Sequence, residues 1–118
     1  MKVTRVPENG SNFVEYEVSG NVISFGDDEI SANLKKKERD EIVKLDVCED
    51  FYGGLTFAPG GARIYVAEIM IPARQYEDVQ VENPSYDPED ENSQEFITEK
   101  RPVPFDIDNV ELTLFELV

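Results

Sequence analysis

Carboxylates, whose oxygens are ligands for hard cations such as Ca²⁺, are the most abundant ionisable side-chain groups of this chain. Nine carboxylates and no basic residue lie between Arg74 and Lys100. Two segments space acidic residues closely, and they supply the candidate ligands Asp87, Glu89, Asp90, Asp106 and Asp108. Neither segment has the glycine and glutamate spacing of the calcium-binding EF-hand loop. Solvated turns are therefore the favoured interpretation, and weak calcium binding is an alternative.

The chain lacks the residues that enzymes most often use for catalysis. The chain has no histidine and no tryptophan, whereas general acid–base and nucleophilic catalysis mostly recruit histidine. Paired carboxylates hydrolyse glycosides, but among 26 acidic residues some pairs reach a suitable separation by chance. We therefore predict that the protein is not an enzyme and carries no cofactor.

Cysteine and glycine offer little further chemistry. Cys48 is the only cysteine, which excludes an intramolecular disulfide and a structural zinc site. Its neighbours Glu49 and Asp50 cannot stabilise a thiolate, so we predict a half-buried strand residue. The pairs Gly53-Gly54 and Gly60-Gly61 precede no lysine-bearing helix, which excludes a P-loop or dinucleotide-binding loop.

Short runs that alternate apolar and polar residues dominate the chain and predict β-strands separated by tight turns. Residues 3–6 suit an edge strand, and residues 13–18 and 21–25 suit a hairpin. Residues 35–41 contain good helix formers but no apolar stripe, so we predict a solvated connection there. Residues 58–61, Ala-Pro-Gly-Gly, predict a chain reversal.

One strand is apolar on both faces except for Glu68. Residues 64–71 therefore predict a strand covered on both sides, which is either central to a sheet or lies between two layers. An unpaired buried charge is costly. We expect Glu68 either to face solvent or to pair with Arg63, Arg74 or Arg101.

Residues 75–81 and 95–100 predict a two-stranded acidic arm that projects from the sheet. The segment between them, within residues 82–94, is polar and contains two prolines, which predicts a flexible acidic loop. The apolar side chains of such an arm need a surface to cover them. The predicted contact residues are Tyr76, Val79, Val81, Tyr86, Phe96 and Ile97.

The fold that we predict is all-β: a single domain over residues 1–118, an antiparallel β-sandwich or open barrel of about eight strands with the projecting arm. No apolar run is long enough to cross a bilayer, and the start lacks the apolar segment of an export signal. These features predict a cytoplasmic protein, or a virion-associated one if it is of phage origin. The net charge of −15 disfavours direct binding to nucleic acid or membrane.

A non-enzymatic structural or protein-interaction module, binding a protein partner or forming a homo-oligomer, fits these features best. In composition it is similar to small acidic β-proteins of phage and prophage virions, which makes an assembly component a candidate. One alternative is an acidic mimic of nucleic acid that inhibits a DNA- or RNA-binding protein. The basic run of Lys35, Lys36, Lys37 and Arg39 argues against that mimic.

Overall fold

The chain folds almost entirely into β-strands. The computed structural model describes residues 1–50, 52–57 and 62–117. These residues form ten strands, one single-turn α-helix and one 3₁₀ turn, so the all-β prediction is confirmed. They divide into two compact units. The first unit comprises Met1–Ala73 and Phe105–Val118, and the hairpin unit comprises Arg74–Pro104.

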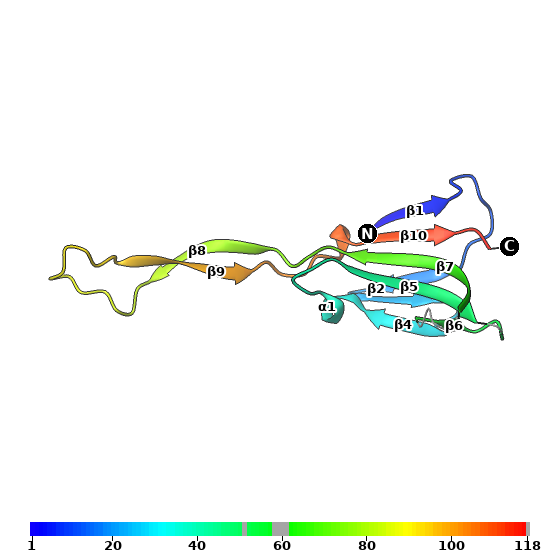
Figure 1. Ribbon diagram of the computed structural model, residues 1–118, viewed down its shortest axis with the longest axis horizontal. Coiled ribbons are helices and arrows are strands. Elements are labelled where there is room, and N and C mark those ends of the chain that lie inside the picture. Colours follow the sequence, from blue (N-terminus) through cyan, green and yellow to red (C-terminus); the bar gives the residue numbers. More distant parts are fainter. Residues whose placement is uncertain (51, 58–61, 118) are drawn as a thin grey trace. The chain divides into compact units, whose positions relative to one another are not determined.

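A five-stranded sheet is the larger of the two sheets of the first unit (Figure 1). Its order is β1 (Lys2–Val6), β10 (Glu111–Phe115), β7 (Ala62–Ile71), β5 (Val43–Asp50) and β6 (Leu55–Thr56). As predicted, β1 lies at an edge and β7 in the centre. The prediction of purely antiparallel pairing is wrong at one edge, because β1 runs parallel to β10. Every other pairing in this sheet is antiparallel.

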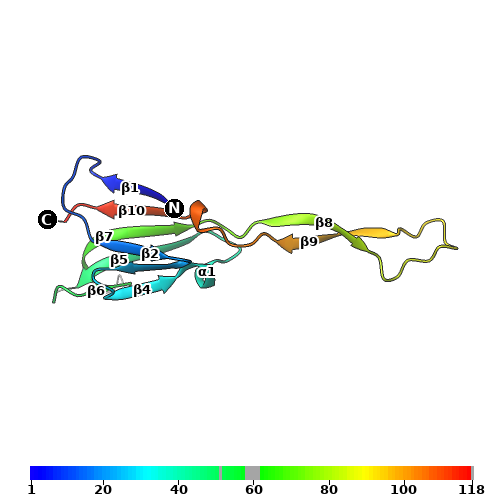
Figure 2. The ribbon, with the colours of Figure 1, turned by 180° about the vertical axis from the view of Figure 1, so that it is seen from behind.

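The second sheet of this unit is an antiparallel meander of β2 (Tyr16–Ser19), β3 (Val22–Phe25) and β4 (Ile30–Asn33). The predicted hairpin is present, with Gly20 in the left-handed region (φ 61°) at its turn. Strand β2 lies behind β5 in Figure 1 and in front of it in Figure 2, where the molecule is seen from behind.

The buried core belongs to the first unit. One cluster joins side chains of the two sheets, among them Ile23, Phe25, Val47, Ile69 and Leu112. Buried and partly exposed residues alternate along β10, so one face of the five-stranded sheet points to the core and the other points away. No sheet of the described residues closes into a barrel.

A single helical turn stands where a solvated connection was predicted. Helix α1 (Leu34–Lys37) begins after Asn33, whose Oδ1 accepts a hydrogen bond from the Lys36 amide (3.3 Å). Leu34 is fully buried, and this one apolar side chain anchors the turn to the core. The prediction of a connection over residues 35–41 is therefore wrong for residues 35–37, whereas residues 38–41 are indeed irregular.

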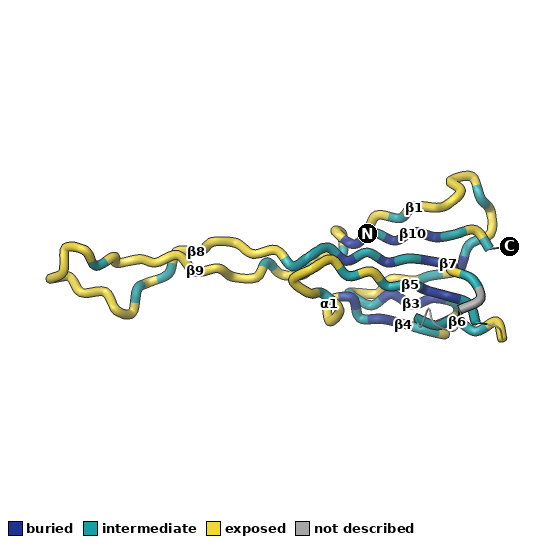
Figure 3. The backbone as a smooth tube through the Cα atoms, in the orientation of Figure 1, coloured by how far each residue is buried: buried dark blue, intermediate teal, exposed yellow. Residues whose placement is uncertain are grey.

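The hairpin unit contains one antiparallel pair, β8 (Tyr76–Glu82) and β9 (Phe96–Pro102). These bounds lie within two residues of those predicted, so the strand pair itself is confirmed. Figure 3 colours the hairpin as exposed or intermediate along its whole length, and no residue from 74 to 104 is buried.

Two further expectations from the sequence concern a chain reversal and membrane-spanning segments. The reversal predicted for residues 58–61 lies outside the described residues. No helix in the described part of the chain has the length and apolar character needed to cross a membrane. A 3₁₀ turn, η2 (Ile107–Asn109), leads into β10.

Candidate interaction surface

The register of the hairpin places three of the predicted contact residues on one face. In an antiparallel pair, directly opposite residues share a face and successive residues alternate. Val81 lies opposite Ile97, and Val79 lies opposite Glu99. Val79, Val81 and Ile97 therefore form one apolar patch, and we call this side the Val81 face. Arg101 Nη2 and Glu99 Oε2 form an exposed ion pair of 3.1 Å beside the patch.

Two aromatic residues lie on the opposite side of the hairpin, which we call the Phe96 face. Tyr76 lies opposite Pro102 at one end of the strand pair, and Phe96 lies opposite Glu82 at the other. Tyr76 is 47% exposed and Phe96 is 49% exposed. Six residues of strand separate these ends, a span of about 20 Å. The five predicted contact residues of the strands are thus divided between two faces and do not form one continuous patch.

Tyr86, the remaining predicted contact residue, belongs to the loop that joins β8 and β9. Its amide donates to the Asn83 carbonyl (3.0 Å), and the Asn83 side chain accepts from the Ser85 amide (2.9 Å). Tyr86 is 41% exposed. It therefore forms a third contact candidate, held in a local turn and separate from either strand face.

The acidic residues of this loop organise its turns. Asp87 Oδ1 accepts from the Glu89 amide (3.0 Å), and Asp90 Oδ1 accepts from the Asn92 amide (2.9 Å). These are turns that aspartate forms with its own backbone. Asp87 and Asp90, two of the candidate calcium ligands, thus have a structural role, and Glu89 lies between them as an exposed residue.

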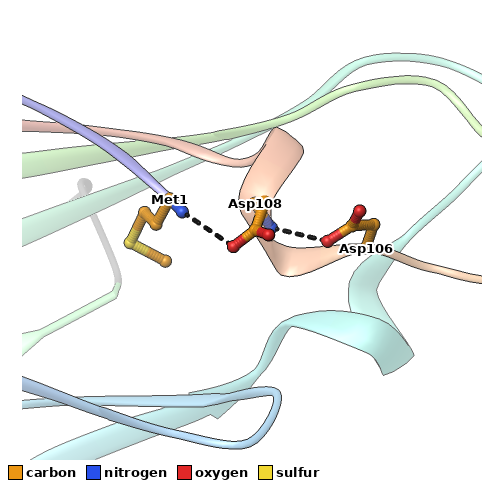
Figure 4. A network of polar contacts seen from close by, with 3 residues as sticks. All are labelled: Met1, Asp106 and Asp108. Atoms are coloured by element: carbon orange, nitrogen blue, oxygen red, sulfur yellow. Dashed lines mark hydrogen bonds and ion pairs between the residues drawn. The ribbon is translucent and has the colours of Figure 1, made fainter.

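The other two candidate ligands, Asp106 and Asp108, lie at η2 (Figure 4). Asp106 Oδ1 accepts a hydrogen bond from the Asp108 amide (2.9 Å) and so caps the turn. The Asp108 carboxylate faces the amino group of Met1 at 3.5 Å. In residues 1–50, 52–57 and 62–117, no three acidic, histidine or cysteine side chains gather in a way that could hold a metal ion.

The hairpin unit is strongly acidic and has no core. All nine of its carboxylates are exposed, and it has three basic residues, which gives a net charge of −6. None of the core cluster comes from this unit. A two-stranded hairpin without a covered face is marginally stable in water, so its exposed apolar side chains are the main candidates for contact with another molecule.

Glu68 occupies a second surface, on the five-stranded sheet. It lies between the fully buried residues Ala67 and Ile69, so its side chain points away from the core. Arg101, one of its predicted partners, pairs with Glu99 instead, and the side chain of Arg63 lies outside the described residues. Within the described part of the chain Glu68 makes no ion pair and is half-buried.

Asp46 is the functional candidate that the sequence reasoning missed. It lies on β5 directly opposite Glu68 of β7. With Ile64, Tyr65 and Phe115, the two carboxylates line a hollow of about 600 Å³. The signal was present in the sequence: Val43, Leu45 and Val47 alternate, which puts Asp46 on the outer face of the strand.

Cys48 lies two residues further along β5 and is fully buried, so the expectation of a half-buried residue is wrong. Burial raises the pKa of the Cys48 thiol, and the negative charge of Asp46 raises it further. The thiol therefore stays protonated at neutral pH and is a poor nucleophile.

Comparison of the chain with protein-family models, curated proteins and solved structures finds no match.

Proposed function

We propose that this protein is a non-enzymatic protein-interaction module whose hairpin unit binds a protein partner or a second copy of the chain. One observation carries the proposal: residues 74–104 contain no buried side chain, although they include three aromatic and several aliphatic residues. Exposed apolar surface of this kind marks contact sites in many proteins. An assembly component of the phage or prophage type would use such a hairpin to hold a neighbouring subunit.

The backbone of the hairpin supports the same proposal. Strands β8 and β9 pair only with each other in the described residues, so each has one edge of unpaired amide and carbonyl groups. An exposed strand edge is a template for a strand of another chain. The Val81 face would then supply specificity through its side chains, while the edge supplies backbone hydrogen bonds.

Removing the apolar patch of the Val81 face tests the proposal. Val81→Thr with Ile97→Thr keeps β-branched residues in both strands but replaces one aliphatic branch at each site, a methyl group of Val81 and the ethyl group of Ile97, with a hydroxyl. Light scattering of the full chain over a range of concentrations measures the oligomeric state. If the native protein is an oligomer, we expect the double variant to shift towards the monomer.

The matched control changes the polar middle of the Phe96 face. Gln80→Thr places the same residue type on the same strand but leaves the apolar patch intact. If the native protein is a monomer, binding to one isolated partner protein is measured instead. We then expect the native protein and the control to bind this partner and the double variant not to bind it. Equal binding or equal oligomeric state for all three proteins would contradict the proposal.

A second candidate function has one observation in its favour. The nine exposed carboxylates of the hairpin unit would suit a mimic of nucleic-acid phosphates. A mimic would bind a basic DNA- or RNA-binding protein, and its binding would weaken steeply with salt. Salt-insensitive binding that depends on Val81 and Ile97 favours the interaction module instead.

We also infer that the two sheets of the first unit form a β-sandwich. The support is the shared cluster, in which Phe25 of β3 and Val47 of β5 are both fully buried. Two sheets that bury their inner faces against each other are the standard solution for an all-β domain of this size.

A further inference from the structure

The outer face of the five-stranded sheet carries a second surface, separate from the hairpin unit. Its centre is the pair of carboxylates Asp46 and Glu68, which lie directly opposite each other on adjacent strands. Opposite residues of an antiparallel pair have Cβ atoms about 5 Å apart, and like charges there destabilise the sheet. The repulsion between the two carboxylates therefore lowers the stability of the free protein.

No cation of the described chain neutralises this pair. Lys44 is the nearest basic residue along β5, on the same face as Asp46. It is exposed, and neither Lys44 nor the two carboxylates takes part in an ion pair among the described residues. Positions that break a local rule in this way, without compensation inside the fold, are often functional.

Apolar and aromatic groups surround the carboxylates. Ile64, Tyr65 and Phe115 line the same hollow, and Tyr65 is 54% exposed. Two acids beside aromatic rings match the chemistry of a guanidinium group. Its planar fork of donors bridges carboxylates, while its face stacks on aromatic rings. The aliphatic stem of an arginine would then cover apolar side chains such as Ile64.

We infer that this hollow is a docking site for an arginine side chain of a basic partner protein. The guanidinium would lie between Asp46 and Glu68, against the ring of Tyr65. Charge complementarity selects a basic partner at this site, because the two carboxylates attract a cationic side chain and a chain of net charge −15 attracts a basic protein. This site does not depend on the function proposed for the hairpin unit.

Short peptides test the site in the full chain. The probe is acetyl-Gly-Arg-Gly-amide, and its control contains citrulline, which has nearly the same shape as arginine but no charge. Amide chemical shifts of the folded protein are followed by NMR at low salt. We expect saturable shifts at Asp46, Tyr65, Glu68 and Phe115 with the arginine peptide, and at least tenfold weaker binding of the citrulline peptide.

Variants then assign the binding to these side chains. Asp46→Asn with Glu68→Gln keeps the shape of the site and should weaken binding of the arginine peptide at least tenfold. Tyr65→Ala, which alters an exposed residue, should weaken it several-fold. The matched control, Glu8→Gln with Asp27→Asn, changes two other exposed carboxylates by the same total charge and should bind as the native protein does.

Several results would overturn the inference. Equal binding of the arginine and citrulline peptides, equal binding by the native protein and the Asp46/Glu68 variant, or no saturable shift would each do so. Shifts produced by CaCl₂ alone, with none from the peptide, would make the hollow a cation site. Oligomers that disperse in the Asp46/Glu68 variant would identify a second copy as the occupant.

Discussion

Asp46 and Glu68 face each other across β5 and β7, on the side of the sheet that points away from the core. Each strand buries its other side, through Val47 on β5 and through Ala67 and Ile69 on β7. The backbones of the two residues are thus held opposite each other by well-packed strands and cannot move apart without disturbing them. The close approach of two acidic residues is built into a pairing of the central strand β7.

Glu68→Gln should stabilise the free protein. The change removes the repulsion and leaves the shape of the side chain unchanged, so we expect the free energy of unfolding to rise by about 0.2–1 kcal/mol. Urea unfolding at neutral pH and low salt measures the change. Added salt should reduce the difference between variant and native protein, because it screens the repulsion in the latter.

Glu17→Gln is the control for this substitution. Glu17 is an exposed strand residue opposite the uncharged Ser24, and the change alters the net charge by the same amount. We expect little effect on stability. A Glu68→Gln variant that is no more stable than Glu17→Gln would show that the two carboxylates do not repel each other appreciably.

Amide hydrogen exchange should be faster in the hairpin unit than in the first unit. The hairpin unit has no buried side chain, so local opening of β8 and β9 exposes little new apolar surface and costs little free energy. Amides paired between β8 and β9 should exchange orders of magnitude faster than those of β7 between Ile64 and Ile71. NMR exchange at neutral pH measures both sets in one sample. Equal protection would contradict an independent, marginally stable hairpin.

Short-range patterns predicted the strands well, and five of the ten described strands, β3, β4, β5, β7 and β10, contain buried side chains. The hairpin of β2 and β3, the central place of β7 and the pairing of β8 with β9 all follow from short-range patterns. The parallel pairing of β1 with β10 joins the two ends of the chain, and no local pattern specifies it. Helix α1 was missed because a single buried residue, Leu34, anchors it.

The candidate sites show the same limit. The sequence singled out Glu68 as an inconsistency in an apolar strand, which is a local signal. That Asp46 stands opposite it depends on the register between β5 and β7, which shifts near Val47. Likewise, the contact residues of the hairpin were identified individually, but the division of the five strand residues between two faces follows only from the pairing of Val81 with Ile97.

Alanine should destabilise the protein more at Gly26 than at Gly20, because the two sites differ in the space around the added Cβ. Gly20 and Gly26 have nearly the same backbone angle, with φ of 61° and 62°. Alanine at either site meets a left-handed penalty of about 1 kcal/mol. A Cβ at Gly20 would meet nothing within 4 Å, whereas one at Gly26 would lie 3.0 Å from Leu55 Cδ1. Urea unfolding should show that Gly26→Ala is the more destabilising, and equal losses would contradict this close approach.

Ionisation of the Cys48 thiol should lower the stability of the protein at alkaline pH. Burial and the charge of Asp46 raise the pKa of the folded thiol above its ordinary value of 9.0. From about pH 9 upward the unfolded chain therefore releases this proton while the folded chain keeps it. The unfolded state then binds fewer protons, so the free energy of unfolding falls as pH rises, by at most about 1.4 kcal/mol per pH unit.

Cys48→Ala removes this titration but leaves a small cavity. The variant should be less stable than the native protein at pH 7.5, and the difference should shrink at pH 10, where the native protein alone has lost the contribution of the thiol. Val47→Ala is the matched control, since it also truncates a fully buried residue of β5 but changes no titrating group. Its deficit in the free energy of unfolding should be the same at both pH values. A deficit of Cys48→Ala that is equally constant would mean that the thiol ionises alike in the folded and unfolded chain.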